Sequence, residues 1–209
     1  MKKSIIMIIA GCIVLALISG CSKETDGNTL NISQLIAMTN LGSAVENPNV
    51  LVDSYELVKN NKLDVTNMPS GWEEMEGNKL LNYYVCSNDN GGMMITVGHK
   101  NKKIVGIDAN DITNGALSSE KSLDRYINAY HILRDRLGEP QTHNVDILYS
   151  SDENVPVSEI EAYLNNHDCN HSYYLEWEMQ DGGSVSIDYQ GANSTVPTGI
   201  TVAANYPYK

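Results

Sequence analysis

The sequence predicts an α+β fold in which helices pack on one face of an antiparallel sheet. Two observations carry this prediction: an amphipathic stretch over Ser119–Leu137, and two runs of alternating apolar and polar residues over 173–179 and 184–189. Such alternation gives a strand one apolar face, which another layer must cover. The amphipathic stretch supplies that cover, so we expect helices and sheet in separate layers.

The helix expected over Ser119–Leu137 has well-marked ends. Glu120 suits the positive end of the helix dipole, and Arg134 and Arg136 suit the negative end. Gly138, with a proline shortly after it, stops the helix. The apolar residues recur at helical spacing and so form one face: Leu123, Tyr126, Ile127, Tyr130, Leu133 and Leu137.

Two shorter helices are also expected. Residues 158–166 begin with Ser158 and Glu161 at the spacing of a capping box, and their apolar residues share one face. Residues 32–39 form a second short candidate near the start of the chain. The helices expected over 32–39 and over 119–137 are each followed by a Leu-Gly pair and then by a set of strands, which indicates a repeated order of elements.

The C-terminal strands predict a three-stranded antiparallel meander. The runs 173–179 and 184–189 flank a turn at Asp181-Gly182-Gly183, which is the pattern of a hairpin with one buried face. A third strand is expected over 200–204, after a loop with proline and glycine. Helices must cover the apolar face of this meander.

The first half of the chain carries a fainter copy of this pattern, with strands expected over 82–85, 93–97 and 103–108. A tyrosine pair precedes a glycine pair by eight residues in the first copy and by nine in the second. We interpret this as a tandem repeat of a helix-then-meander unit, over 29–115 and 116–209, within one compact body. Chance similarity between two hairpins remains the alternative.

The second copy resembles a known architecture. A helix ending in Leu137-Gly138-Glu139-Pro140, followed by a strand bearing Trp177 and a glycine turn, is similar to the β-lactamase-inhibitor-protein-like domains and to the single unit of small outer-membrane assembly lipoproteins. The resemblance covers residues 119–204 better than residues 30–110. It implies helices packed against an antiparallel meander and says little about partners.

The N-terminus resembles the export signal of bacterial lipoproteins. Lys2 and Lys3 precede an apolar run too short to span a bilayer, and the run ends in Leu17-Ile18-Ser19-Gly20-Cys21, which resembles a lipobox. The resemblance implies that residues 1–20 are removed and that Cys21 carries acyl chains as its only covalent addition. Residues 21–28 then form a polar tether to the folded body. We expect a bacterial lipoprotein anchored in the cell membrane or outer membrane, on the extracytoplasmic side.

Charge narrows the classes of partner. The chain has 14 basic and 26 acidic residues, a formal net charge of −12, which argues against binding to nucleic acid. Removing Lys2 and Lys3 leaves 12 basic residues against the same 26 acidic ones, and thus −14. The chain has no Phe but 12 Tyr and 2 Trp, so aromatic packing relies on rings with polar tips.

Cysteine and histidine leave two questions open. Cys86 and Cys169 remain after lipidation, and export permits a disulfide between them, although two separate buried thiols are equally compatible. His167, Cys169 and His171 are candidate zinc or copper ligands, but the sequence indicates no further ligand, so a polar helix end is favoured and no cofactor is expected. Residues 108–111 contain acidic and amide side chains but lack EF-hand spacing, which favours a strand end over a calcium loop.

An acidic, tyrosine-bearing face is the strongest candidate for function. Carboxylates at three positions should project from the polar side of the C-terminal hairpin, with a tyrosine beside them and a second tyrosine from the first repeat if the registers correspond. The candidate partner surface comprises Tyr84, Tyr174, Glu176, Glu178 and Asp188. Tyrosines among acids suit protein recognition. A solvated strand face and a general acid–base set of a hydrolase are the alternatives.

These observations favour a non-enzymatic, lipid-anchored module that binds a protein or another component of the envelope. The familiar catalytic sequence motifs, such as a Gly-x-Ser-x-Gly elbow or a phosphate-binding glycine loop, do not occur. The main alternative is a lipoprotein that binds a small molecule or a metal. A flat open sheet face would favour the binding module, whereas a deep pocket holding two of the candidate carboxylates would favour a hydrolase.

Overall fold

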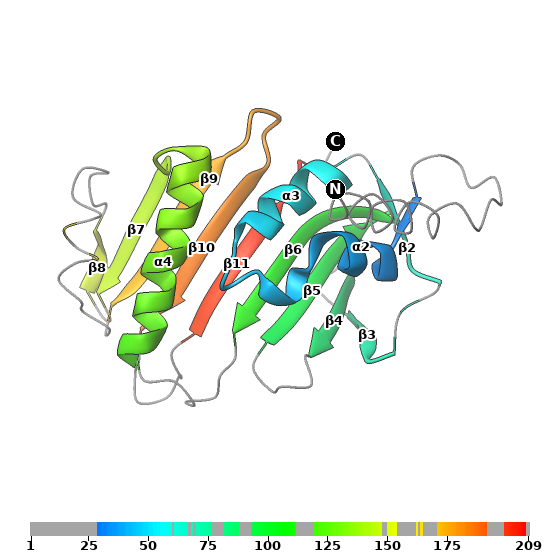
Figure 1. Ribbon diagram of the computed structural model, residues 1–209, viewed down its shortest axis with the longest axis horizontal. Helices are drawn as coiled ribbons and strands as arrows, with labels where there is room; N and C mark the ends of the chain where they lie inside the picture. Colours follow the sequence, from blue (N-terminus) through cyan, green and yellow to red (C-terminus); the bar gives the residue numbers. More distant parts are fainter. Residues whose placement is uncertain are drawn as a thin grey trace, which may run out of the picture.

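The computed structural model consists of a broad, mostly antiparallel sheet with helices on one side (Figure 1). It describes residues 29–59, 61–66, 68, 70–76, 82–87, 93–111, 119–147, 150–153, 162, 164, 171–191 and 199–207. Helices α2 (Ile32–Thr39), α3 (Asn49–Val58) and α4 (Ser119–Leu137) all lie in front of the sheet in this view, and a short 3-10 helix, Leu41–Ser43, follows α2. The predicted α+β class is confirmed.

The sheet is built from an N-terminal and a C-terminal set of strands. Its main path, from one edge to the other, is β3 (Trp72–Glu76), β4 (Asn82–Ser87), β5 (Met93–Lys100), β6 (Lys103–Asp111), β11 (Gly199–Asn205), β10 (Ser184–Gln190), β9 (Ser172–Glu178), β7 (Thr142–Ile147) and β8 (Ser150–Glu153). Off this path, β1 (Thr29–Asn31) pairs parallel with β2 (Lys62–Asp64), and β2 also pairs with β6.

The two halves of the sheet meet where β6 pairs antiparallel with β11, and we call this pair the seam. Each strand is the last of its half, and Ala109 lies opposite Val202 at the middle of their register. From the seam outward, each half runs backwards along the chain, through β5, β4 and β3 on one side and through β10 and β9 on the other. The seam therefore joins residues about 90 positions apart into one continuous surface.

The core lies between the sheet and the helices. One cross-strand row shows this directly, because its five residues are directly opposite one another and all are buried: Trp177, Val185, Ala204, Ile107 and Val97. From α4, the ring of Tyr126 packs against Tyr173 and Tyr189, with centroid distances of 6.1 Å and 5.9 Å. The alternation seen in the sequence thus turns one side of each central strand towards the helices.

The end of α4 is tied to the sheet through one glycine. Gly138 takes a φ of 85°, a left-handed conformation that favours glycine, and its amide donates to the carbonyl of Arg134 at 2.8 Å. The carbonyl of Gly138 then accepts a hydrogen bond from the indole N–H of Trp177 at 2.8 Å. Helix termination and the docking of β9 are therefore coupled at the Leu-Gly-Glu-Pro segment.

The expected elements agree with the structure in most places. The helices over Ile32–Thr39 and Ser119–Leu137 and the strands around β4, β5, β6, β9, β10 and β11 occur where they were predicted. Of the helix expected over 158–166, only residues 162 and 164 are described, and both are helical. Helix α3 and strands β1, β2, β3, β7 and β8 were not predicted.

Candidate functional site

The side of the central strands that faces away from the helices forms the candidate site. We call it the open face and define it on β9, β10, β11 and β6. No described helix lies on this side, because α2, α3 and α4 all pack on the other (Figure 1). Register places two rows of mostly polar residues across it, Glu176–Ser186–Ala203–Asp108 and Tyr174–Asp188–Thr201–Asn110.

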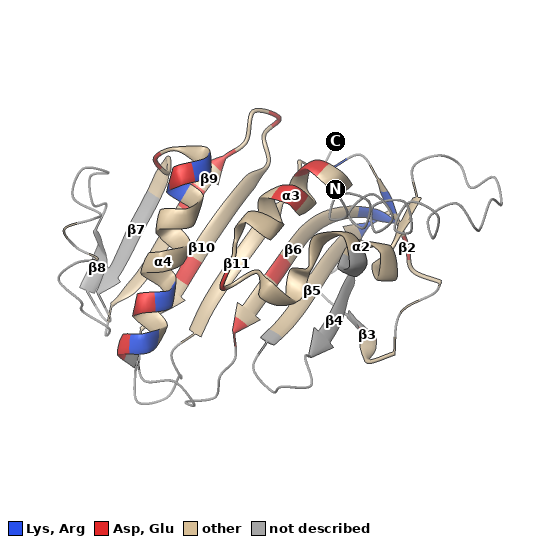
Figure 2. Cartoon of the chain, viewed as in Figure 1, with Lys and Arg blue, Asp and Glu red and all other residues tan. Residues whose placement is uncertain are grey.

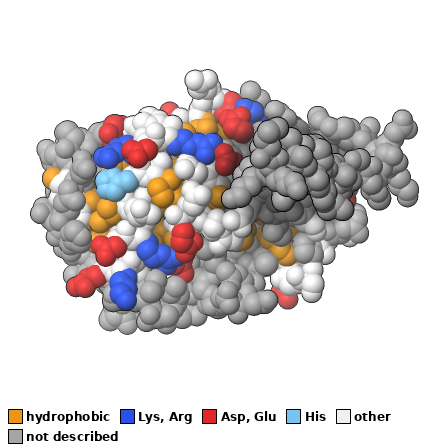
Figure 3. Space-filling view, viewed as in Figure 1, with side chains coloured by type: hydrophobic (Ala, Val, Ile, Leu, Met, Phe, Trp, Pro, Cys, Tyr) orange, Lys and Arg blue, Asp and Glu red, His pale blue; other side chains and the backbone are white. Residues whose placement is uncertain are grey.

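The open face carries charge of one sign. Asp108, Glu176, Glu178 and Asp188 occupy it, whereas none of its positions on β6, β11, β10 or β9 holds Lys or Arg. Figure 2 shows acidic positions on β6 and β10, while α4 carries both signs. Figure 3 shows basic and acidic side chains interspersed over the helix side. The open face therefore carries acidic residues alone, whereas the helix side carries charges of both signs.

Charges on the helix side are neutralised locally. Arg125 of α4 forms ion pairs with the buried carboxylate of Asp111 and with Glu46. Arg136 lies 2.6 Å from Asp53, with the distance measured between nitrogen and oxygen. These pairs join α4 to the first half of the chain and leave its basic groups engaged within the molecule.

Tyr174 is fixed within the open face. Its phenol forms hydrogen bonds with the side chains of Glu176 and Ser186. Burial, and next the negative charge of Glu176, raise the pKa of Tyr174, so its phenol stays protonated at neutral pH. Tyr174 therefore interacts with a residue of β9 and a residue of β10, and its ring adds apolar area to an otherwise polar surface.

Asp108 is half-buried within the open face, as Glu176 is, whereas Glu178 and Asp188 are exposed. Burial alone raises the pKa of Asp108 to about 6. Its directly opposite neighbours are Thr96 on β5 and Ala203 on β11, neither of which carries charge. Among the described residues its carboxylate forms no ion pair. Asp188, although exposed, is also partly desolvated, and this raises its pKa in the same direction.

Four of the five predicted surface residues lie at positions of the open face: Tyr174, Glu176, Glu178 and Asp188. Tyr84 is on β4, outside the four strands that define this face, and is paired in register with Val97 of β5. That Tyr84 belongs to the same surface stays a prediction.

The sequence analysis missed Asp108 as a member of this site. It appeared only in the calcium alternative, together with Asp111. The structure places residues 108–111 within β6, where Asp111 points to the helices and pairs with Arg125 while Asp108 lies on the open face. Strand alternation separates the two carboxylates, so they do not form a common cation loop.

Comparisons with known proteins leave the site to be judged on its geometry. No protein-family model, curated protein or solved structure matches this chain. Among the described helices, none combines the length and the apolar character needed to cross a membrane. The predicted signal segment, Cys21 and the tether lie outside the described residues.

The remaining sequence candidates are only partly visible. His167 and Cys169 lie outside the described residues, so neither the metal set nor a bridge to Cys86 of β4 can be followed. His171 precedes β9, and its ring centroid lies 6.3 Å from that of Tyr173. Within the described part of the chain, His, Cys, Asp and Glu side chains form no cluster of three suited to a metal.

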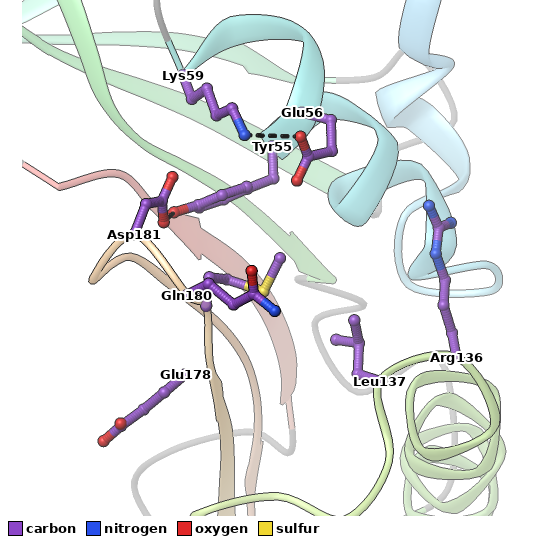
Figure 4. A pocket seen from close by; sticks show the side chains of 9 residues that line it. Tyr55, Glu56, Lys59, Arg136, Leu137, Glu178, Gln180 and Asp181 are labelled. Carbon is purple, nitrogen blue, oxygen red and sulfur yellow. Dashed lines mark hydrogen bonds and ion pairs between the residues drawn. The ribbon is translucent and has the colours of Figure 1, made fainter.

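A pocket of about 590 Å³ lies on the helix side, between α3, the end of α4 and the β9–β10 turn (Figure 4). Its lining residues are Tyr55, Glu56, Lys59, Arg136, Leu137, Glu178, Met179, Gln180 and Asp181. The phenol of Tyr55 donates to Asp181, and Lys59 pairs with Glu56 at 2.8 Å. Burial and the hydrogen bond to Asp181 raise the pKa of Tyr55. Most polar groups of this pocket are thus engaged with one another.

Only one of the three carboxylates considered for acid–base chemistry reaches the pocket. Glu178 is among its lining residues, whereas Glu176 and Asp188 are not. In Figure 4 the Glu178 carboxylate points away from Tyr55 and Lys59. The pocket therefore does not bring two of these carboxylates together.

Proposed function

We propose that the protein is a lipid-anchored, extracytoplasmic binding module of the bacterial envelope, and that its open face binds a basic protein partner. The observation that carries the proposal is the open face itself, a sheet surface with Asp108, Glu176, Glu178 and Asp188 and no basic residue at its positions. Complementary charge across an interface selects the partner and speeds its encounter.

The lipid anchor and the acidic body serve separate purposes in this proposal. Acyl chains on Cys21 hold the protein at the membrane, and two or more chains are needed for stable attachment. With residues 1–20 removed, the formal charge of −14 causes anionic lipid to repel the body. The open face is therefore free to meet a protein rather than the bilayer.

A binding role also fits the shape of the site better than catalysis does. The polar groups of the open face are spread over four strands, and even Glu176 and Asp108, which share a row of the register, are separated by Ser186 and Ala203. Tyr174 supplies apolar area with a hydrogen-bonding tip, a combination enriched at protein interfaces. We accordingly assign no catalytic residue and no cofactor.

Site-specific photo-crosslinking in the native envelope tests the proposal. A photoreactive residue replaces Thr201, at the centre of the open face, and in a matched strain it replaces Asp135, which is exposed on α4. We expect an adduct with a basic protein from position 201 alone, and its loss on Glu176→Lys plus Glu178→Lys. Equal adducts from both positions, or none from position 201, would overturn the proposal.

The second candidate is a small-molecule site in the pocket beside Tyr55. Its volume of about 590 Å³ falls in the range of ligand sites. A ligand there would have to displace the Lys59–Glu56 pair or the hydrogen bond between Tyr55 and Asp181. A native mass spectrum of protein isolated from its own membrane, compared with Lys59→Ala, tests this candidate, since a retained small molecule would be lost from the variant.

A further inference from the structure

We propose that Asp108 is the anchor of the open face, accepting the ammonium or guanidinium group of a lysine or arginine side chain from the basic partner. This inference rests on the proposed function and names the residue that determines specificity within it. Three properties of Asp108 carry the inference: its place at the seam, the small size of its neighbours and the lack of a compensating charge beside it.

The position of Asp108 is central. It lies on β6 beside the seam, and its register partner across the seam is Ala203. The main path of the sheet has three strands beyond β6 on one side, and on the other side β11 and four more strands. Residues at the centre of an interface are the most completely desolvated and contribute most to binding, because the rim excludes water from them.

The neighbours of Asp108 leave room for a long side chain. Directly opposite are Thr96 and Ala203, and two positions away on the same strand are Gly106 and Asn110. Even a methyl group added at Gly106 would meet only ordinary contacts, the nearest at 3.5 Å. A lysine or arginine approaching from outside therefore meets short side chains around the carboxylate.

The electrostatic argument comes from comparing two aspartates of the same strand. Asp111 faces the helices, is buried, and has the guanidinium of Arg125 as its partner. Asp108 faces outward and is half-buried, and no described basic side chain pairs with it. A partly desolvated carboxylate without a counter-charge is unfavourable, so an arriving cation recovers more free energy there than at a fully solvated acid.

The remaining acids of the face extend this preference. Glu176 lies in the same cross-strand row as Asp108, and Asp188 lies in the next row. Both carboxylates add negative potential along the path of a cationic side chain that crosses β10 and β11. Neither lies on a strand of the seam, so we assign them to steering and Asp108 to the anchoring contact.

A binding experiment with a defined probe tests the anchor. The full chain, in micelles of an uncharged detergent, is titrated into a fluorescein-labelled peptide of alternating lysine and serine, with the glutamate–serine peptide as the negative probe. We expect Asp108→Asn to weaken binding about tenfold. The matched control Asp135→Asn, which removes the same charge from the helix side, should change binding less than about twofold.

A second variant blocks access to the Asp108 carboxylate without removing its charge. Ala203→Tyr keeps the Asp108 carboxylate but covers it, and should weaken binding about as much as Asp108→Asn. If neither variant weakens binding while Glu176→Lys plus Glu178→Lys abolishes it, the anchor is overturned and the docking face stands. If the wild-type protein does not distinguish the two peptides, or the double lysine variant still binds the lysine peptide normally, the proposed function fails as well.

Discussion

The phenol ring of Tyr55 lies against the backbone of Gly183 so closely that no side chain fits at position 183. A Cβ there would collide with the Tyr55 ring and with the carbonyl oxygen of Asn205. The same ring stacks on Tyr206, with centroids 4.9 Å apart and planes inclined by 10°. Helix α3, the β9–β10 turn and the end of β11 therefore meet at one point.

Gly183→Ala should lower the free energy of unfolding by about 2 kcal/mol, because one of the colliding groups is backbone and cannot rotate away. Urea denaturation monitored by Trp fluorescence measures this. Gly42→Ala is the matched control, since nothing lies within 4 Å of a Cβ at that position, and it should stay within about 0.5 kcal/mol of wild type. Equal effects of the two substitutions would contradict the close approach.

Stability should fall between about pH 4 and pH 6 because of Asp108. Its pKa is about 6 in the folded protein and near 3.8 when unfolded, so the folded state binds its proton more tightly. That contribution is complete below pH 4 and is lost as the pH rises through 6, with an upper limit of about 3 kcal/mol that solvent contact reduces. Asp108→Asn should remove this loss and make the protein more stable at pH 7.5.

The control for this pH dependence is Asp135→Asn, which should leave the slope unchanged. Thr96 and Ala203, directly opposite Asp108, do not titrate. The raised pKa of Asp188 on the same face leaves a smaller slope of the same sign in the Asp108→Asn variant. The midpoint of urea unfolding, measured at pH 4, 5, 6 and 7.5, tests this prediction. If the midpoints of Asp108→Asn change with pH as those of the wild type do, Asp108 is not the source of the pH dependence.

Arg125→Met should destabilise the protein by about 3 kcal/mol, because it leaves Asp111 buried without its counter-charge. Arg136→Met breaks a solvent-exposed pair with Asp53 and a hydrogen bond to the carbonyl of Asn49, and should cost about 1 kcal/mol. Adding Asp111→Asn to Arg125→Met should recover part of the loss. Thermal unfolding of the three variants measures their stabilities. If Arg125→Met and Arg136→Met destabilise the protein equally, the buried pair is no more important than the exposed one.

Cys21→Ser should release the protein from the membrane fraction, because the acyl chains are the proposed anchor and the acidic body is repelled by anionic lipid. Phase partition in a temperature-separating detergent measures the change. Cys12→Ser lies within the segment expected to be removed and serves as the control, which should remain in the detergent phase. A Cys21→Ser protein that still enters this phase would exclude the lipid anchor.

Much of the fold follows from local periodicity. Helix α4 and the hairpin β9–β10 were predicted because their apolar residues repeat at the period of a helix or a strand. Helix α3 was missed since Val50, Leu51 and Val52 form a continuous apolar run, which hides the helical spacing of the buried residues that follow. Strand β7 was missed because its segment, Thr142–Ile147, is largely polar.

The site was predictable only within one hairpin. Tyr174, Glu176 and Asp188 could be grouped because alternation along β9 and β10 and the short turn between them place them together. Asp108 joins them only through the register of the seam, which pairs residues distant in sequence and leaves no local pattern. The position of Tyr84 likewise depends on pairing with β5, which no local pattern of β4 indicates.

The seam also fixes when the open face comes into existence. A chain made from its N-terminus carries β6 long before β11, whose last residue is Asn205. Until β11 has been made, β6 and β10 have no strand between them, and Asp108 has no neighbour on that side. A stalled or shortened chain therefore exposes an unpaired β6 edge but not the assembled acidic surface, so the binding proposed for this face requires the finished chain.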